Sequence, residues 1–85
     1  MRTFTWSIAK NEQLKRTRGV SFEEILASEL IDIRHHPKRK NQNIMLFRRE
    51  GYVWVVPFVE QGDDIFMKTL YPSRQYTKLL QKKET

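Results

Sequence analysis

Hydrophobic and polar residues change their spacing along the chain, and the changes separate extended from helical segments. Residues 3–6 (TFTW) alternate in a way that predicts a short strand. Residues 8–18 are mostly polar, but Ser7 before them and Gly19 after them are residue types that begin and end helices. We therefore expect a strand followed by a peripheral helix.

A second helix is predicted by the four residues SFEE. Ser21 and Glu24 have the spacing of a capping box, in which each side chain satisfies a free backbone N–H. Apolar residues then recur at helical spacing at Phe22, Ile25, Leu26 and Leu30.

Three strands are predicted next. Residues 31–36 (IDIRHH) alternate, and Pro37 ends that strand. Residues 43–49 (NIMLFRR) and 52–60 (YVWVVPFVE) flank a Glu-Gly turn and predict an antiparallel hairpin. The second hairpin strand is apolar on both faces, which favours a central place in the sheet and a core position for its tryptophan.

The last part of the chain predicts one more strand and a helix. Pro57 removes one ladder donor and favours a bulge or a locally open edge. Residues 65–71 (IFMKTLY) predict the next strand, and Ser73 can cap a helix to about residue 83. The expected fold class is α+β, with a small antiparallel sheet, two N-terminal helices and one C-terminal helix in a single domain of residues 1–85.

Composition adds limits to this picture. A hydrophobic fraction of 39% in 85 residues is enough for one compact core. The chain has no cysteine, which excludes disulfides and thiolate zinc sites. The longest apolar run, VWVVPFV, is far shorter than a membrane span, and the N-terminus does not resemble a signal peptide. We expect a cytoplasmic, soluble protein with no membrane partner.

Charge is unevenly distributed along the chain. The net charge is +6, and residues 34–49 contain six Lys and Arg but no acid. Basic domains of this kind bind polyanions, because phosphate contacts release counterions. Ordinary charge for solubility is the alternative, but the segregation of charge favours a binding face.

Two features of the basic segment have candidate chemistry. His36 follows His35 on a strand, so the two side chains point to opposite faces. Either His36 acts as an acid or base, or one histidine is solvated and the other is partly buried. The loop after them can hold phosphates and read bases, although a solvated surface loop has the same composition. Its candidate RNA-binding residues are Lys38, Arg39, Lys40, Asn41 and Gln42.

A third candidate lies near the C-terminus. Lys68 shares a strand face with apolar neighbours, and Ser73 would place the N-terminus of a helix close to it. Arg74 and Lys78 follow on one stripe of that helix, with Tyr76 on another. We expect Lys68, Arg74 and the helix N-terminus to converge on a phosphate-binding centre, the alternative being a solvated helix face.

Five motifs in this order resemble the BrnT family of toxins from type II toxin–antitoxin modules. They are W…KNEQLKRTRGVSFEEI, IDIRHHP, NQ before a strand, YVWVVPFVE and KTLYPSRQYTK, and they span nearly the whole chain. The resemblance implies a RelE/ParE-like fold, ribonuclease activity without a cofactor, and a ribbon-helix-helix antitoxin similar to BrnA. It also implies that the toxin binds DNA only through its complex with that antitoxin.

With that resemblance, the sequence predicts a metal-independent endoribonuclease toxin that inhibits translation. The expected catalytic residues are His36, Lys68, Arg74, Tyr76 and Lys78, and Ser73 joins the basic loop as an RNA contact. The alternative is a non-catalytic toxin or RNA-binding module of the same fold, such as a ParE-like inhibitor of topoisomerase.

Overall fold

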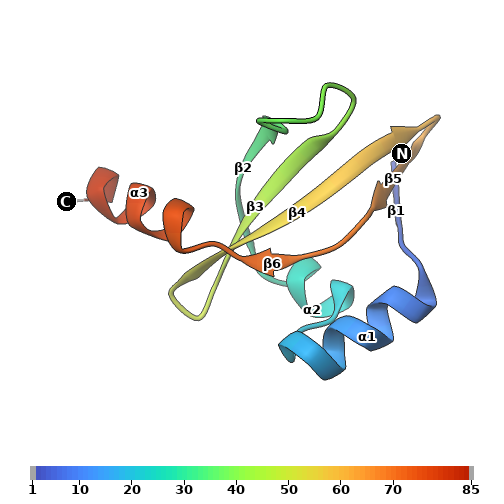
Figure 1. Cartoon of the computed structure of the whole chain (residues 1–85), viewed down its shortest axis with the longest axis horizontal. Coiled ribbons are helices and arrows are strands. Elements are labelled where there is room, and N and C mark those ends of the chain that lie inside the picture. Colours follow the sequence, from blue (N-terminus) through green and yellow to red (C-terminus); the bar gives the residue numbers. More distant parts are fainter. Residues whose placement is uncertain (1, 85) are drawn as a thin grey trace.

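The chain folds into a mixed six-stranded sheet with three helices (Figure 1). The computed structural model describes residues 2–84, and side chains up to Gln81. Its elements are β1 (Thr3–Thr5), α1 (Ile8–Arg18), α2 (Phe22–Leu26), β2 (Glu29–His35), β3 (Asn43–Arg49), β4 (Tyr52–Gln61), β5 (Asp64–Met67), β6 (Tyr71–Pro72) and α3 (Arg74–Glu84). The strand order is β1-β5-β4-β3-β2, with β6 also beside β4. The predicted α+β class is confirmed, and each helix within residues 2–84 is too short or too polar to cross a membrane.

The ends of α1 lie where the sequence predicts them. The Ser7 hydroxyl accepts a hydrogen bond from the Lys10 N–H at 3.2 Å. Gly19 has the left-handed backbone conformation, with φ of 73°, and its N–H donates to the Lys15 carbonyl at 3.1 Å. Leu14 is the buried residue of this otherwise exposed helix and attaches it to the core.

The helix α2 is shorter than predicted. Its capping box is present, since Ser21 Oγ accepts from the Glu24 N–H at 3.1 Å and Glu24 Oε1 accepts from the Ser21 N–H at 3.2 Å. The prediction that Leu30 lies on the helix is wrong, because Leu30 pairs with Phe47 in the β2–β3 ladder and is 48% exposed. The helical spacing beyond Leu26 depends on Leu30 alone, and pairing between strands has overridden it.

Glu24 makes the stability of α2 dependent on acid. Hydrogen bonds from the Lys15 ammonium and from Ser21 lower the pKa of Glu24 from 4.5 to about 2. A lowered folded-state pKa stabilises the fold above the unfolded value, and this contribution is lost as pH falls from 4.5 towards 2. We expect Glu24→Gln to flatten the dependence of Tm on pH in that window, measured by circular dichroism.

The matched control for this prediction is Glu12→Gln, which removes one carboxylate from an exposed position of α1. It should leave the acid dependence of Tm as steep as in the native protein. An equally steep acid dependence in Glu24→Gln would contradict the assignment.

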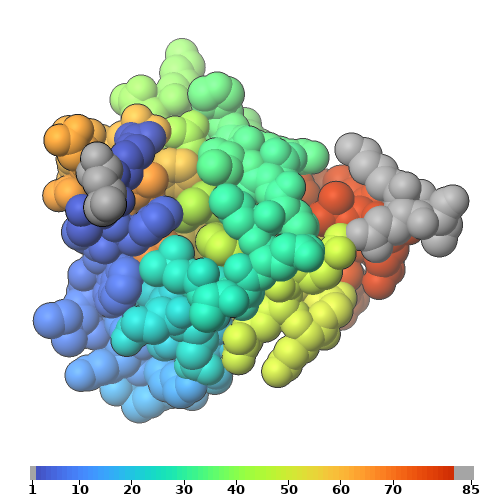
Figure 2. Space-filling model, turned by 180° about the vertical axis from the view of Figure 1, so that it is seen from behind, coloured from blue at the N-terminus to red at the C-terminus, as the bar shows by residue number. Residues whose placement is uncertain are grey.

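The sheet has a different core on each face. Alternate residues of β3 belong to different clusters, with Met45 and Phe47 facing α1 and α2, and Ile44 and Leu46 facing α3. Trp54 packs against the first cluster, as expected for a core residue. Figure 2 shows α2 and β2 in front in teal, with α3 in red at one side of the molecule. The helix α3 and the two N-terminal helices, α1 and α2, thus cover opposite faces of the sheet.

The sequence predicts an antiparallel sheet, but one pair of strands in the structure is parallel. β1 pairs with β5 in parallel, with Phe4 opposite Ile65. A parallel pair needs a long connection, and here the connection contains all the elements from α1 to β4. β1 consists of three residues, so its direction is set by its distant partner.

The segment that pairs with β4 is interrupted opposite Pro57. Met67 pairs with Phe58 and Tyr71 pairs with Val55, so three residues of one chain segment face two of the other. The single predicted strand 65–71 is therefore two strands, β5 and β6. The Pro57 carbonyl accepts from the Lys68 N–H at 2.8 Å, and the missing N–H of the proline points to this same side. The prediction of a bulge or a locally open edge at Pro57 agrees with this interruption of the pairing.

Candidate functional site

The basic loop between β2 and β3 is closed by hydrogen bonds from His36. The backbone N–H of His36 donates to the Gln42 carbonyl at 2.9 Å, and the Gln42 N–H donates to the Arg39 carbonyl at 3.3 Å. The imidazole Nδ1 accepts from the N–H groups of Lys38 and Arg39, at 3.1 and 3.2 Å. The loop therefore has a defined, turned shape, although residues 37–41 are exposed.

An open pocket of about 380 Å³ lies between this loop and the interruption beside Pro57. We call it the His36 pocket, and its lining residues are His36, Lys38, Arg39, Gln42, Pro57, Lys68, Thr69 and Tyr71. Three of these residues are cations and none is a carboxylate. Such a lining suits an anionic group such as phosphate. His36 is half-buried, while its neighbour His35 is exposed.

Tyr71 extends the His36 pocket towards α3. Burial raises the pKa of the Tyr71 phenol above its usual range, and the nearby Tyr76 adds to this shift. Tyr71 therefore keeps its proton at neutral pH and can donate a hydrogen bond to a ligand. The sequence predicted Tyr71 as the end of a continuous strand, and its place in the pocket depends on the break before β6.

Tyr76, one of the expected catalytic residues, packs against the cluster beneath α3. The guanidinium carbon of Arg34 lies 5.6 Å from the centre of its ring, within the range of a cation–π contact. Arg34 Nε also donates to Asp32 Oδ2 at 2.7 Å, and this hydrogen bond raises the pKa of Arg34. Arg34 was missed as a site neighbour because only the β2–β3 register places it on the α3 face.

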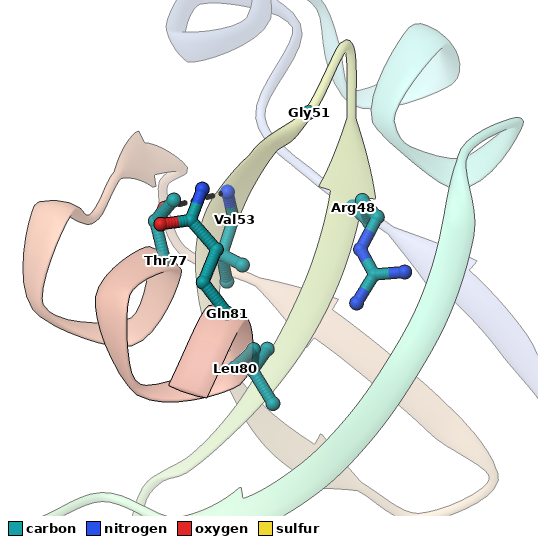
Figure 3. A pocket seen from close by; sticks show the side chains of 6 residues that line it. All are labelled: Arg48, Gly51, Val53, Thr77, Leu80 and Gln81. Carbon is teal, nitrogen blue, oxygen red and sulfur yellow. Dashed lines mark hydrogen bonds between the residues drawn. The ribbon is translucent and has the colours of Figure 1, made fainter. Parts of the chain in front are cut away.

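Arg74 and Lys78 lie in a different pocket, on the flank of α3 that faces the β3–β4 turn. This pocket of about 480 Å³, called the Arg74 pocket, is lined by Gly51, Tyr52, Arg74, Thr77, Lys78 and Gln81. A smaller pocket beside it, drawn in Figure 3, is lined by Arg48, Gly51, Val53, Thr77, Leu80 and Gln81.

The expected convergence of Lys68, Arg74 and the α3 N-terminus on one centre is therefore not found. His36 and Lys68 share one pocket, whereas Arg74 lines the other. The reason is helical geometry: Tyr76 and Leu80 face the sheet, so the stripe with Arg74 points towards the turn.

The remaining predicted residues lie outside the His36 pocket. Lys40 and Asn41 are exposed at the tip of the basic loop. Ser73 caps α3, since its Oγ accepts from the Tyr76 N–H at 3.1 Å. Among the side chains that the structure describes, up to Gln81, no group of three or more His, Asp or Glu is placed to hold a metal ion.

Comparison with solved structures relates this fold to a known toxin. The crystal structure of the ribonuclease toxin BrnT from Brucella abortus superposes with a TM-score of 0.59 and 15% sequence identity. The match covers 88% of this chain and 100% of the BrnT chain. No protein-family model matches the sequence, and neither does any curated protein. The chain therefore has a BrnT-like fold.

Proposed function

We propose that this protein is the toxin of a type II toxin–antitoxin module and that it cleaves RNA in the His36 pocket. The observation that carries the proposal is the shared pocket of His36 and Lys68, which also contains Lys38 and Arg39. The likeness to a solved ribonuclease toxin supports it. We place the fold within the wider RelE/ParE-like group on the strength of the sequence motifs.

The proposed reaction uses a nucleophile that RNA itself supplies. The ribose 2′-oxygen attacks the adjacent phosphorus while the bond from phosphorus to the 5′-oxygen breaks. The 2′-hydroxyl gives its proton to a water molecule, and the departing 5′-oxygen takes a proton from the Lys68 ammonium, which solvent restores, leaving a 2′,3′-cyclic phosphate and a 5′-hydroxyl. The protein has to transfer protons, neutralise phosphate charge and orient the strand, which its own side chains can do without a metal ion.

Each of these tasks has candidate residues in the His36 pocket. Lys68 comes from the segment between β5 and β6 and Arg39 from the basic loop, and together they would hold the phosphate. The Lys68 ammonium is an acid that can protonate the 5′-oxygen, and the Gln42 amide can bond the ribose or a base edge. Lys40 and Asn41 would contact the strand outside the pocket.

The Arg74 pocket gives this protein a second basic surface, made by Arg74 and Lys78 beside Tyr52. We propose that an acidic, partly apolar segment of a ribbon-helix-helix antitoxin covers it together with the basic loop, which would block RNA. DNA would then be bound only through the antitoxin.

A non-catalytic toxin of the same fold is the second candidate function, for example a ParE-like inhibitor of topoisomerase. The separation of Arg74 from His36 and Lys68 favours it, because a catalytic centre would gain from having all three. RNA cleavage distinguishes the two candidates directly.

The test is incubation of the purified chain with end-labelled RNA in excess EDTA. We expect cleavage to continue, with cyclic phosphate and 5′-hydroxyl ends on the products. DNA of the same sequence, which lacks the 2′-hydroxyl, should stay intact. Cleavage that EDTA abolishes would disprove the metal-independent mechanism, and no cleavage under any condition would favour the non-catalytic toxin.

A further inference from the structure

The ring of His36 has its tautomer fixed by its surroundings. Both groups that bond to Nδ1 are backbone N–H donors, from Lys38 and Arg39. An amide N–H can only donate, so Nδ1 must carry the lone pair, and the proton of the neutral imidazole lies on Nε2.

This tautomer limits what His36 can do to a substrate. Nε2 has no lone pair while it carries the proton, so it cannot take a proton from a ribose hydroxyl. To act as a base there, the ring would have to move its proton to Nδ1 and break both hydrogen bonds to the loop. The geometry is that of a donor at Nε2 and an acceptor at Nδ1.

The same contacts show why the loop needs this side chain. Pro37 has no N–H, so the first donors available after His36 are those of Lys38 and Arg39. A side-chain acceptor that binds the N–H two and three residues later is the arrangement with which Asn and Asp close turns. The backbone N–H of His36 closes the loop a second time by donating to Gln42.

We propose that His36 is a positioning residue, whose Nδ1 folds the loop so that Lys38 and Arg39 face the anion in the His36 pocket. For RNA as the anion this rests on the proposed function, whereas the role in the loop is independent of it. Substitution of His36 by Asn and by Gln distinguishes the roles of the two ring nitrogens. The side-chain oxygen of Asn takes the position of Nδ1, whereas the side-chain amide of Gln reaches the position of Nε2.

The test compares His36→Asn with His36→Gln, using Arg16→Ala on the exposed side of α1 as a charge control. We expect His36→Gln to raise the KM for an RNA oligonucleotide about tenfold, since it loses two backbone hydrogen bonds, with little change in kcat. His36→Asn should restore most of that loss. A large fall in kcat in both variants, at unchanged KM, would instead make His36 the acid or base.

A second measurement decides the loop role even if the native chain cleaves no RNA. Amide hydrogen exchange at Lys38 and Arg39, followed by NMR, should be slow in the native protein and in His36→Asn but faster in His36→Gln. Imidazole nitrogen shifts should show the Nε2–H form. Equal exchange rates in all three proteins, or a proton on Nδ1 of the neutral ring, would overturn the proposal.

Discussion

Replacing Lys68 by methionine should lower kcat for RNA cleavage by on the order of 10²-fold, the effect of losing one preorganised charge donor to a transition state. Lys68 lies at the interruption between β5 and β6, and its side chain is exposed in the His36 pocket. The fold should remain, because the Lys68 backbone N–H still donates to Pro57. Single-turnover kinetics measure the loss, and the circular dichroism spectrum checks the fold.

The control for Lys68→Met is Arg16→Ala, which removes one positive charge from the opposite face of the sheet and should cleave at the native rate. Lys68→Met prepared in the same way also shows whether cleavage comes from a contaminating nuclease. Cleavage by Lys68→Met at the native rate would show that the activity comes from a contaminating nuclease or from a site outside the His36 pocket, and either result contradicts the proposed role of Lys68.

Replacing Thr77 by valine should destabilise the protein by about 1–3 kcal/mol, the cost of leaving a buried donor without a partner. Thr77 Oγ1 accepts from the Val53 N–H at 2.9 Å and donates to the Ser73 carbonyl at 2.6 Å. Thr77, drawn beside Val53 in Figure 3, is 8% exposed, so water has little access to its hydroxyl. For a domain of this size the Tm should fall by roughly 4–8 °C per kcal/mol.

Thr17→Val on α1 is a matched control for this substitution. Thr17 Oγ1 donates to the Gln13 carbonyl at 2.8 Å, the same local bond, but it lies on an exposed helix face and receives no strand N–H. Its effect should stay within about 0.5 kcal/mol. An equal loss of stability in both variants would show that Thr77 does not stabilise the protein by linking α3 to β4.

Structure that depends on nearby residues is what the sequence predicts well. The ends of α1 follow from Ser7 and Gly19, and the capping box of α2 from Ser21 and Glu24, since each cap forms within a few residues. The hairpin of β3 and β4 has its bounds set by alternation and a turn in the same way, to within a residue.

Features that depend on distant partners could not be predicted. The parallel pairing of β1 and the transfer of Leu30 from helix to strand both come from contacts with segments far along the chain. The site divides along the same line. His36 and Lys68 were expected together and meet in one pocket, but the rotation of α3 about its own axis, which moves Arg74 away, is set by how Tyr76 and Leu80 pack on the sheet.

The His36 pocket lies where Pro57 interrupts the pairing of β4 with β5 and β6. A residue with an N–H at this position would offer a donor to residues 68–70 and could draw them into a continuous ladder with β4. The strand would then run straight through the space beside the basic loop. The proline gives up backbone pairing at one point, and the protein gains there a hollow in which cations from two distant parts of the chain meet. A fold of 85 residues thus obtains the His36 pocket from one missing backbone N–H, without an additional domain.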